Sequence, residues 1–154
     1  MTTELQKLAK LIHSIQPGIL TLLGDTTLRF INDNFNRQGF QGSSFIQWPA
    51  RSKNTRNGGT KILSGKTGIL MRSPKKIRHG NSITIIVDVP YAQIHNQGGT
   101  INRSNSNTTN RNKQGTGSSN IPQRRFTGKS PVLDKMCEKA VTKFLTQNLK
   151  QNGI

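Results

Sequence analysis

Apolar residues near the start of the chain recur every three or four positions, which is the spacing of one face of an α-helix. The first such stretch runs from residue 3 to residue 15, and Thr2 or Thr3 can cap it. Its apolar face is formed by Leu5, Leu8, Leu11, Ile12 and Ile15. The pair Pro17-Gly18 follows and predicts that this helix stops there.

A second helix is predicted over residues 19–37. Its apolar face comprises Leu20, Leu23, Thr27, Phe30, Ile31 and Phe35. Gly39 is predicted to end this helix in the left-handed conformation. Two helices joined by a short Pro-Gly turn predict a helical hairpin that shares its apolar faces.

The last helix is predicted over residues 130–150. Ser130 can cap it, and Pro131 suits its first position. One face is apolar and comprises Val132, Leu133, Met136, Ala140, Val141, Phe144, Leu145 and Leu149. The other face carries Lys135, Lys139 and Lys143.

The middle of the chain has the alternating pattern of strands. Residues 75–78 and 82–89 predict a β-hairpin whose turn is His79-Gly80-Asn81. Alternate residues of the second arm are all apolar, namely Ile83, Ile85, Val87 and Val89. This face therefore belongs on a core.

Two neighbouring segments have weaker patterns. Residues 40–60 contain Gly, Ser, Asn and Pro in turn-forming combinations, so an irregular loop is expected there. Residues 61–72 are compatible with a strand or with a short helix, and the pattern does not distinguish the two.

A short helix is predicted over residues 91–96, broken by Gly98-Gly99. Residues 102–120 contain no apolar side chain, which predicts a flexible, polar, basic loop at the tip of a long hairpin. The chain is therefore expected to be one α+β domain over residues 1–154, with N-terminal helices and a small, mostly antiparallel sheet. The C-terminal helix is expected to pack on that sheet.

The composition indicates that part of the chain lies outside the packed core or packs against partners, because only 31% of residues are hydrophobic and 5% aromatic. The net charge is +17, from 23 Lys and Arg against 6 Asp and Glu. Such an excess favours anionic partners, whether nucleic acid or an acidic protein. A solvated basic surface without a specific partner is the alternative.

No acidic residue lies between Asp33 and Asp88, a window rich in Lys and Arg. Basic side chains at this density can neutralise phosphates without reading base sequence. The candidate contacts to DNA or to an acidic partner are Arg51, Lys53, Arg56, Lys61, Lys66, Lys75, Lys76, Arg78, Arg103, Arg111 and Lys113.

No catalytic, cofactor-binding or metal-binding residues are predicted. The acids are scattered, and the three histidines and the single cysteine, Cys137, lack the spacing of metal ligands. His95 is interpreted as a local hydrogen-bonding residue beside the Gly-Gly turn, in preference to a metal or catalytic role. The N-terminus lacks a signal-peptide core and no apolar stretch suffices for a membrane span, so a cytoplasmic location before assembly and no membrane partner are expected.

Four short segments occur in a characteristic order, at residues 45–49, 62–73, 91–99 and 122–130. In order and spacing they resemble the phage virion morphogenesis family, which includes the Mu-like tail-completion proteins. The matching residues are Trp48, Leu63, Gly68, Leu70, Tyr91, Ala92, Ile94, His95, Gly98, Gly99, Pro122, Arg125, Phe126 and Gly128. Either Arg124 or Arg125 can correspond to the arginine of the last segment.

The resemblance implies a structural virion protein, without enzymatic activity or cofactor, that completes or joins the phage tail or neck. It implies a ring around the DNA channel, with a hexamer expected, and contacts to other tail, neck or connector proteins. Trp48, residues 91–99 and Phe126 are assigned either to the body or to the contact between subunits. A non-sequence-specific nucleic-acid-binding protein is the alternative function.

Overall fold

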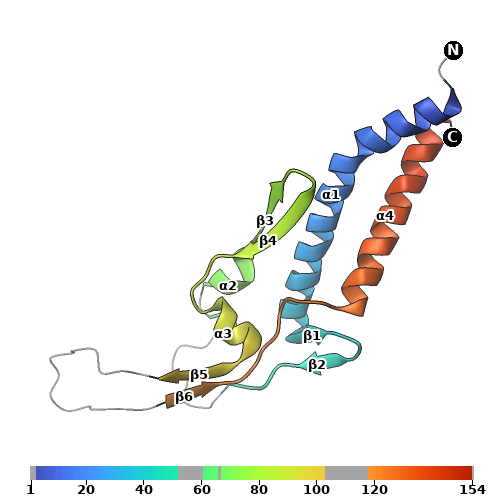
Figure 1. Ribbon diagram of the computed structural model, residues 1–154. Coiled ribbons are helices and arrows are strands. Elements are labelled where there is room, and N and C mark those ends of the chain that lie inside the picture. The colour runs from blue at the N-terminus through green and yellow to red at the C-terminus, as the bar shows by residue number, and fades with distance from the viewer. Residues whose placement is uncertain (1–2, 52–60, 66, 103–117, 154) are drawn as a thin grey trace, which may run out of the picture.

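Two long helices dominate the protein, α1 (Glu4–Arg37) and α4 (Pro131–Gln151), and they lie side by side (Figure 1). The computed structural model describes residues 3–51, 61–65, 67–102 and 118–153. The short helices α2 (Ile69–Arg72) and α3 (Ala92–Gln97) and the strands gather toward the end of α1. The predicted α+β class is confirmed.

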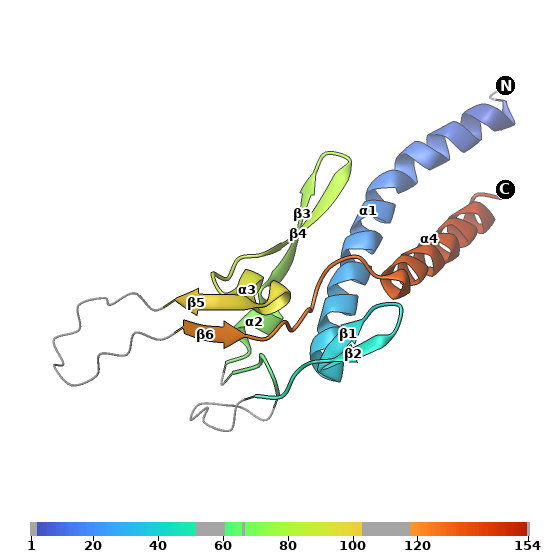
Figure 2. The same ribbon diagram turned by 60° about the horizontal axis from the view of Figure 1, so that its bottom comes forward.

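The strands pair as two-stranded antiparallel hairpins. In the described part of the chain they form three separate sheets, where the sequence predicted a single small one. The pairs are β1 (Gly39–Gln41) with β2 (Phe45–Gln47), β3 (Pro74–His79) with β4 (Ser82–Val87), and β5 (Gly99–Asn102) with β6 (Ser118–Ile121). Figure 2 shows the β5–β6 hairpin extending away from the helix pair.

The predictions for these hairpins were of unequal success. The β3–β4 hairpin is confirmed, although its second strand ends at Val87 and not at Val89. Pairing of β5 with β6 confirms the stem of the predicted long hairpin, while residues 103–117 of its loop lie outside the described residues. The β1–β2 hairpin was missed, because turn-forming residues dominate the segment from residue 40 onward.

The prediction of two N-terminal helices separated at Pro17 was wrong. Helix α1 continues through Pro17 for 34 residues, with Thr3 and Gln6 forming a capping box at its start. Proline removes one backbone hydrogen bond and displaces one carbonyl, so it can bend a helix without ending it. Figure 1 shows α1 bending in its first half. No helical hairpin therefore forms within residues 3–37.

Gly18 is a packing residue and not a stop. A β-carbon at this position would lie 2.8 Å from Cζ of Phe144, which is closer than packed carbon atoms approach. The glycine therefore lets the Phe144 ring of α4 rest against the α1 backbone. Contact with α4 on both sides of Pro17 stabilises the continuous helix.

The end of α1 also differs from the prediction. Gln38, with φ of 58°, takes the left-handed position assigned to Gly39, and its side chain donates to the Phe35 carbonyl at 2.6 Å. Gly39 instead begins β1, where a β-carbon would collide with the Phe45 ring. Glycine is required at residue 39 for close cross-strand contact and not for its conformation.

Helix α4 begins as predicted, with the Ser130 hydroxyl accepting from the backbone N–H groups of Val132 and Leu133. Its packing differs, because α4 lies along α1 and not on a sheet. A two-stranded hairpin offers too little apolar surface to cover a 21-residue helix, whereas α1 offers a long apolar face.

The core lies where the end of α1 meets the short elements. Its buried members are Phe30, Ile31, Phe35, Phe40, Trp48, Leu70, Ala92 and Phe126. Phe35 is central, with its ring centroid 5.3 Å from that of Trp48 and 5.2 Å from that of Phe126. The segment left undecided, 61–72, contributes α2 and its buried Leu70.

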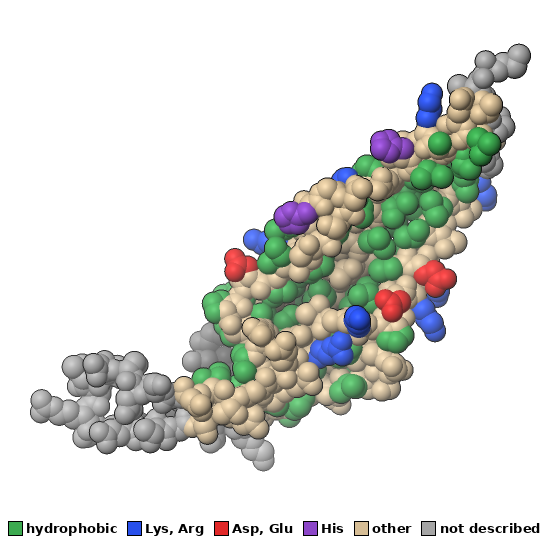
Figure 3. Space-filling view, viewed as in Figure 1, with side chains coloured by type: hydrophobic (Ala, Val, Ile, Leu, Met, Phe, Trp, Pro, Cys, Tyr) green, Lys and Arg blue, Asp and Glu red, His purple; other side chains and the backbone are tan. Residues whose placement is uncertain are grey.

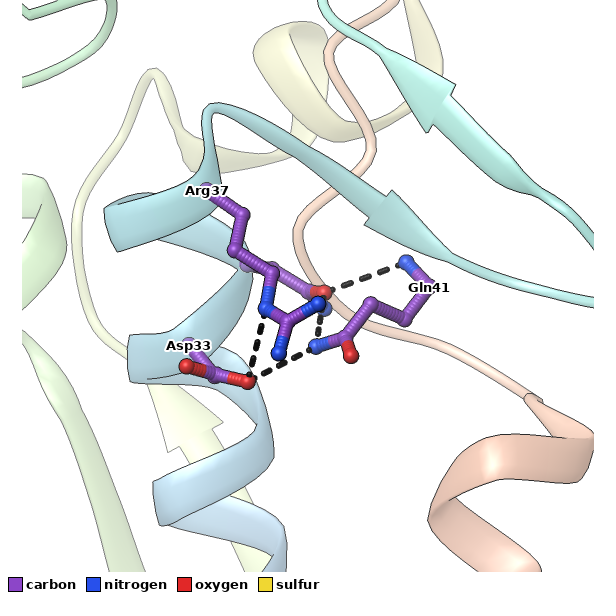
Figure 4. A network of polar contacts seen from close by, with 4 residues as sticks. Asp33, Arg37 and Gln41 are labelled. Atoms are coloured by element: carbon purple, nitrogen blue, oxygen red, sulfur yellow. Dashed lines mark hydrogen bonds and ion pairs between the residues drawn. The ribbon is translucent and has the colours of Figure 1, made fainter.

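A polar network closes the last turns of α1 onto β1 (Figure 4). Arg37 pairs with Asp33 at 3.2 Å, and the Gln41 amide donates to Asp33 and to Asn34, each at 3.2 Å. The backbone N–H of Gln41 also donates to the Asn34 side chain at 3.1 Å. These contacts fix the direction in which the chain leaves the helix.

Candidate functional site

The four motif segments converge on one cluster, called here the junction and formed by Trp48, Leu70, Ala92 and Phe126. Each residue comes from a different segment, and their exposed fractions are 4%, 2%, 6% and 1%. All four belong to the core cluster around Phe35. The motif therefore specifies how four distant parts of the chain pack against the end of α1.

The segment of residues 122–130 crosses the junction without forming a helix or a strand. Its backbone is bound by side chains from three other elements: Trp48 Nε1 donates to the Arg125 carbonyl at 2.7 Å, and Asn34 Nδ2 donates to the Phe126 carbonyl at 3.1 Å. Asn96 Oδ1 accepts from the N–H groups of Phe126 and Thr127 at 2.9 and 3.1 Å. These side chains replace the partners that a strand or helix would supply.

The two arginines of this segment both make contacts within the chain, Arg124 as a buried residue and Arg125 as a partly buried one. Arg124 is 8% exposed and donates to the carbonyls of Pro49 and Ala50 at 3.0 and 3.1 Å. Burial, and secondarily the charge of Arg51, lowers the pKa of Arg124. Arg124 therefore joins the 122–130 segment to the chain that follows Trp48.

Arg125 lies over the Phe40 ring, with its guanidinium carbon 4.1 Å from the ring centroid. It also donates to the Lys129 carbonyl at 3.0 Å. Gly128 has φ of 133°, and a β-carbon there would lie 2.5 Å from the Arg125 guanidinium. Glycine at residue 128 thus makes room for the arginine in a backbone conformation that other residues rarely adopt.

His95 lies on α3 beside a cavity of about 430 Å³ whose lining includes Arg51, Leu70, Tyr91 and Arg124. The edge of the Tyr91 ring meets the imidazole, with centroids 6.0 Å apart. Nδ1 of His95 is buried and has no hydrogen-bond partner in the described part of the chain. Its backbone carbonyl accepts from the Arg124 N–H at 2.7 Å, so the residue joins α3 to the 122–130 segment.

Burial, and after it the nearby Arg124 charge, lowers the pKa of His95. Near pH 6.5 His95 becomes protonated in the unfolded chain but stays neutral in the folded protein. The free energy of unfolding should therefore fall as the pH drops below about 6.5. Above that pH both states are neutral at His95 and the effect vanishes. Urea unfolding between about pH 5 and 8 is expected to show a smaller pH dependence for His95→Gln than for wild type. If the free energy of unfolding depends on pH equally in wild type and in His95→Gln, His95 does not have a lowered pKa in the folded protein.

The Gly98-Gly99 pair ends α3 and starts β5. Gly98 has φ of 74°, and a β-carbon there would lie 2.9 Å from the backbone nitrogen of Gln123. The close approach brings the end of α3 against the 122–130 segment. Tyr91, which is 43% exposed, lines the cavity, while Ile94 packs against Gly99, where a β-carbon would lie 2.9 Å from the Ile94 Cδ1.

The remaining motif residues shape the α2 side of the same cavity. Leu63 has φ of 61° and lines the cavity, and Gly68, with φ of 62°, caps α2. Pro122 also lines the cavity. Motif residues from three of the four segments therefore line the cavity as well as forming the junction.

The candidate anion-binding residues do not form one patch within the described ranges. Arg51 donates to the Lys61 carbonyl beside the cavity, whereas Lys75, Lys76 and Arg78 lie on β3. Lys76 pairs with Asp25 of α1 at 2.5 Å, and Arg78 donates to the Gly80 carbonyl at 3.0 Å. The other candidates, Lys53, Arg56, Lys66, Arg103, Arg111 and Lys113, lie outside the described residues. Contact with DNA or an acidic partner stays a prediction.

Two residues that hold this site together, Asn34 and Asn96, were not singled out from the sequence. Arg124 was named only as one of two possible motif arginines, and its bonds to the carbonyls of Pro49 and Ala50 were not predicted. Asn34 lies between Ile31 and Phe35 on the apolar face of α1. A polar residue at this position was the sequence signal that could have identified it as a buried hydrogen-bonding residue. Ser130 was predicted as a cap, but its hydroxyl also donates to the Gln41 carbonyl.

Among the described residues, no group of three His, Cys, Asp or Glu side chains is placed to hold a metal ion. Within the same ranges, no helix combines the length and apolar character that crossing a membrane demands.

The comparisons with known proteins agree with the motif pattern. No curated protein and no solved structure gives a significant match. The model of the phage virion morphogenesis family matches residues 1–146, which include α1, all four motif segments and most of α4. The chain therefore belongs to the phage virion morphogenesis family.

Proposed function

We propose that this protein completes or joins the phage tail or neck as one subunit of a ring around the DNA channel. Family membership gives it a role in building the phage virion, and the finer assignment extends that role. A hexamer is the expected ring, with other tail, neck or connector proteins as its neighbours. The protein would be made in the host cytoplasm and retained in the virion.

The observation that carries the proposal is the convergence of the four motif segments on the junction, within a match over residues 1–146. The motif residues Trp48, Leu70, Ala92 and Phe126 are nearly inaccessible to solvent. Their arrangement serves a stable body, as an assembly subunit requires, and leaves the surface to make contacts. The geometry suits a building block of a particle.

The charge of the chain suits a position near DNA. A net charge of +17 favours nucleic acid through long-range attraction that does not depend on base sequence. Attraction of this kind is compatible with a channel through which DNA of any base sequence passes. The same charge supports the alternative, a free protein that binds nucleic acid without forming part of a ring.

Light scattering on nuclease-treated protein, at low and high salt, tests the proposal together with negative-stain imaging. A ring is expected, with a mass near six times the 17.1 kDa of one chain. A monomer that forms rings only when tail components are added would also support it. A monomer that ignores tail and head components but binds DNA with a steep salt dependence would favour the alternative.

Particle assembly provides the direct functional test. A phage lacking this gene is expected to accumulate filled heads and unjoined tails, visible by electron microscopy, and the wild-type protein should restore joined particles. Normal particles in its absence would contradict the proposed role.

A further inference from the structure

The outer end of the helix pair carries an open apolar groove. It lies between the first half of α1 and the last turns of α4, with a volume of about 610 Å³. Its lining consists of Leu8, Leu11, Ile12, Ile15, Gln16, Ile19, Leu145 and Leu149. Figure 3 shows hydrophobic side chains gathered between the two helices on this face. Ile12 is 57% exposed, so apolar surface remains in contact with water there.

A second apolar surface lies on the β1–β2 hairpin. Phe45 and Ile46 are 50% and 61% exposed. Ile46 lies on the same face as its cross-strand partner Phe40, which is buried in the core, and Phe45 lies on the opposite face. The exposed Phe45 and Ile46 side chains are therefore apolar surface that this copy leaves uncovered. The hairpin follows the end of α1, far along the helix from the groove (Figure 1).

Both surfaces lack charge in a strongly charged protein. Residues 11–24, 38–50 and 144–149 contain no Lys, Arg, Asp or Glu, although the chain carries 23 Lys and Arg. Two copies of a chain with net charge +17 repel each other wherever their basic surfaces meet. Uncharged apolar patches are the surfaces through which such copies can associate.

We propose that the β1–β2 hairpin of one copy docks into the α1–α4 groove of the next, with Phe45 and Ile46 in contact with the groove. The two surfaces differ in shape and lie at opposite ends of α1, so the contact is head-to-tail. A pair of copies then keeps one free groove on the first copy and one free hairpin on the second. Repetition of such a contact generates a ring when the rotation between copies closes. This inference rests on the ring assembly proposed above, and it identifies the surfaces through which neighbouring copies in the ring meet.

Two lysine variants test the contact, Ile12→Lys in the groove and Ile46→Lys on the hairpin. Both positions are mostly exposed, so neither substitution removes core packing. Sedimentation velocity is expected to show wild type associating and each variant weakened at least about tenfold, since each places a charge in an apolar contact. Ile69→Lys, at a 54% exposed position on α2, is the matched control and should associate like wild type.

Mixing the two variants gives the decisive measurement. Ile12→Lys retains an intact hairpin and Ile46→Lys an intact groove, so an equimolar mixture should form a one-to-one heterodimer that grows no further. Circular dichroism checks that each variant is folded, and Ile12→Gln or Ile46→Gln replaces a variant that is not.

Three outcomes would overturn the inference. They are a wild-type protein that stays monomeric at its highest soluble concentration, variants that associate like wild type, and monomeric variants that form no heterodimer. A separate readout, the joining of heads to tails by the wild-type protein, tests the proposed function. If another virion protein fills the groove, the wild-type protein would join heads to tails although its copies do not associate through the hairpin and the groove.

Discussion

Trp48→Ala is expected to destabilise the protein by about 3–5 kcal/mol, the range for removing a large aromatic side chain from a core. The indole is 4% exposed and packs edge-on against Phe35, with centroids 5.3 Å apart. Its loss opens a cavity in the junction and leaves the Arg125 carbonyl without its 2.7 Å donor. Equilibrium unfolding in urea measures the effect, with an unchanged denaturant dependence indicating that both proteins unfold as one unit.

Trp48→Phe separates packing from hydrogen bonding. It keeps most of the ring volume but removes Nε1, so a loss of about 1–3 kcal/mol is expected, as for one unsatisfied buried group. A loss equal to that of Trp48→Ala would mean that the hydrogen bond, and not the packing, dominates. If Trp48→Ala is nearly as stable as wild type, the residue does not hold the junction together.

Trp48→Ala also tests the alternative role of Trp48 as a contact between subunits. If Trp48→Ala is folded and its oligomer mass is unchanged, Trp48 packs within its own chain and does not contact another subunit. A folded protein that no longer associates would assign it to the contact between copies. Mass measurements on the folded fraction distinguish these results.

Local periodicity predicted that both ends of the chain are helical, because each long helix shows its apolar face every three or four residues, although it did not predict that α1 is a single helix. Ser130 and Pro131 fixed the start of α4 to the residue. The strand pair β3–β4 was found for a similar reason, since alternation of apolar side chains is visible within a few residues. These elements depend on short-range patterns.

The errors arise where contacts between distant residues decide the structure. Pro17-Gly18 has the local composition of a stop, but packing of Phe144 against Gly18 keeps α1 continuous. The partner of α4 was wrongly predicted for the same reason, because a sheet face and a longer α1 compete for its apolar side. Local sequence does not contain the outcome of that competition.

The junction was partly visible in the sequence. The order of the four segments indicated which residues belong together, while the identity of the connecting polar side chains did not follow. Asn96 and Arg124 bind backbone groups 30 and 75 residues away. Such bonds have no periodicity, so they become apparent only in the folded structure.

Asn34→Leu is expected to cost about 2–5 kcal/mol, although leucine has a similar size and suits a helix, because two buried backbone groups lose their partners. Asn34 is fully buried, donating to the Phe126 carbonyl at 3.1 Å and accepting from the Gln41 N–H at 3.1 Å. Asn36→Leu makes the same change at an exposed position of α1 and should shift stability by less than about 0.5 kcal/mol. Urea unfolding of the two variants side by side measures the difference. Equal stabilities would show that the Asn34 bonds are not needed to hold the 122–130 segment and β1 on α1, whereas the expected gap would make this one amide the link between the long helix and the motif.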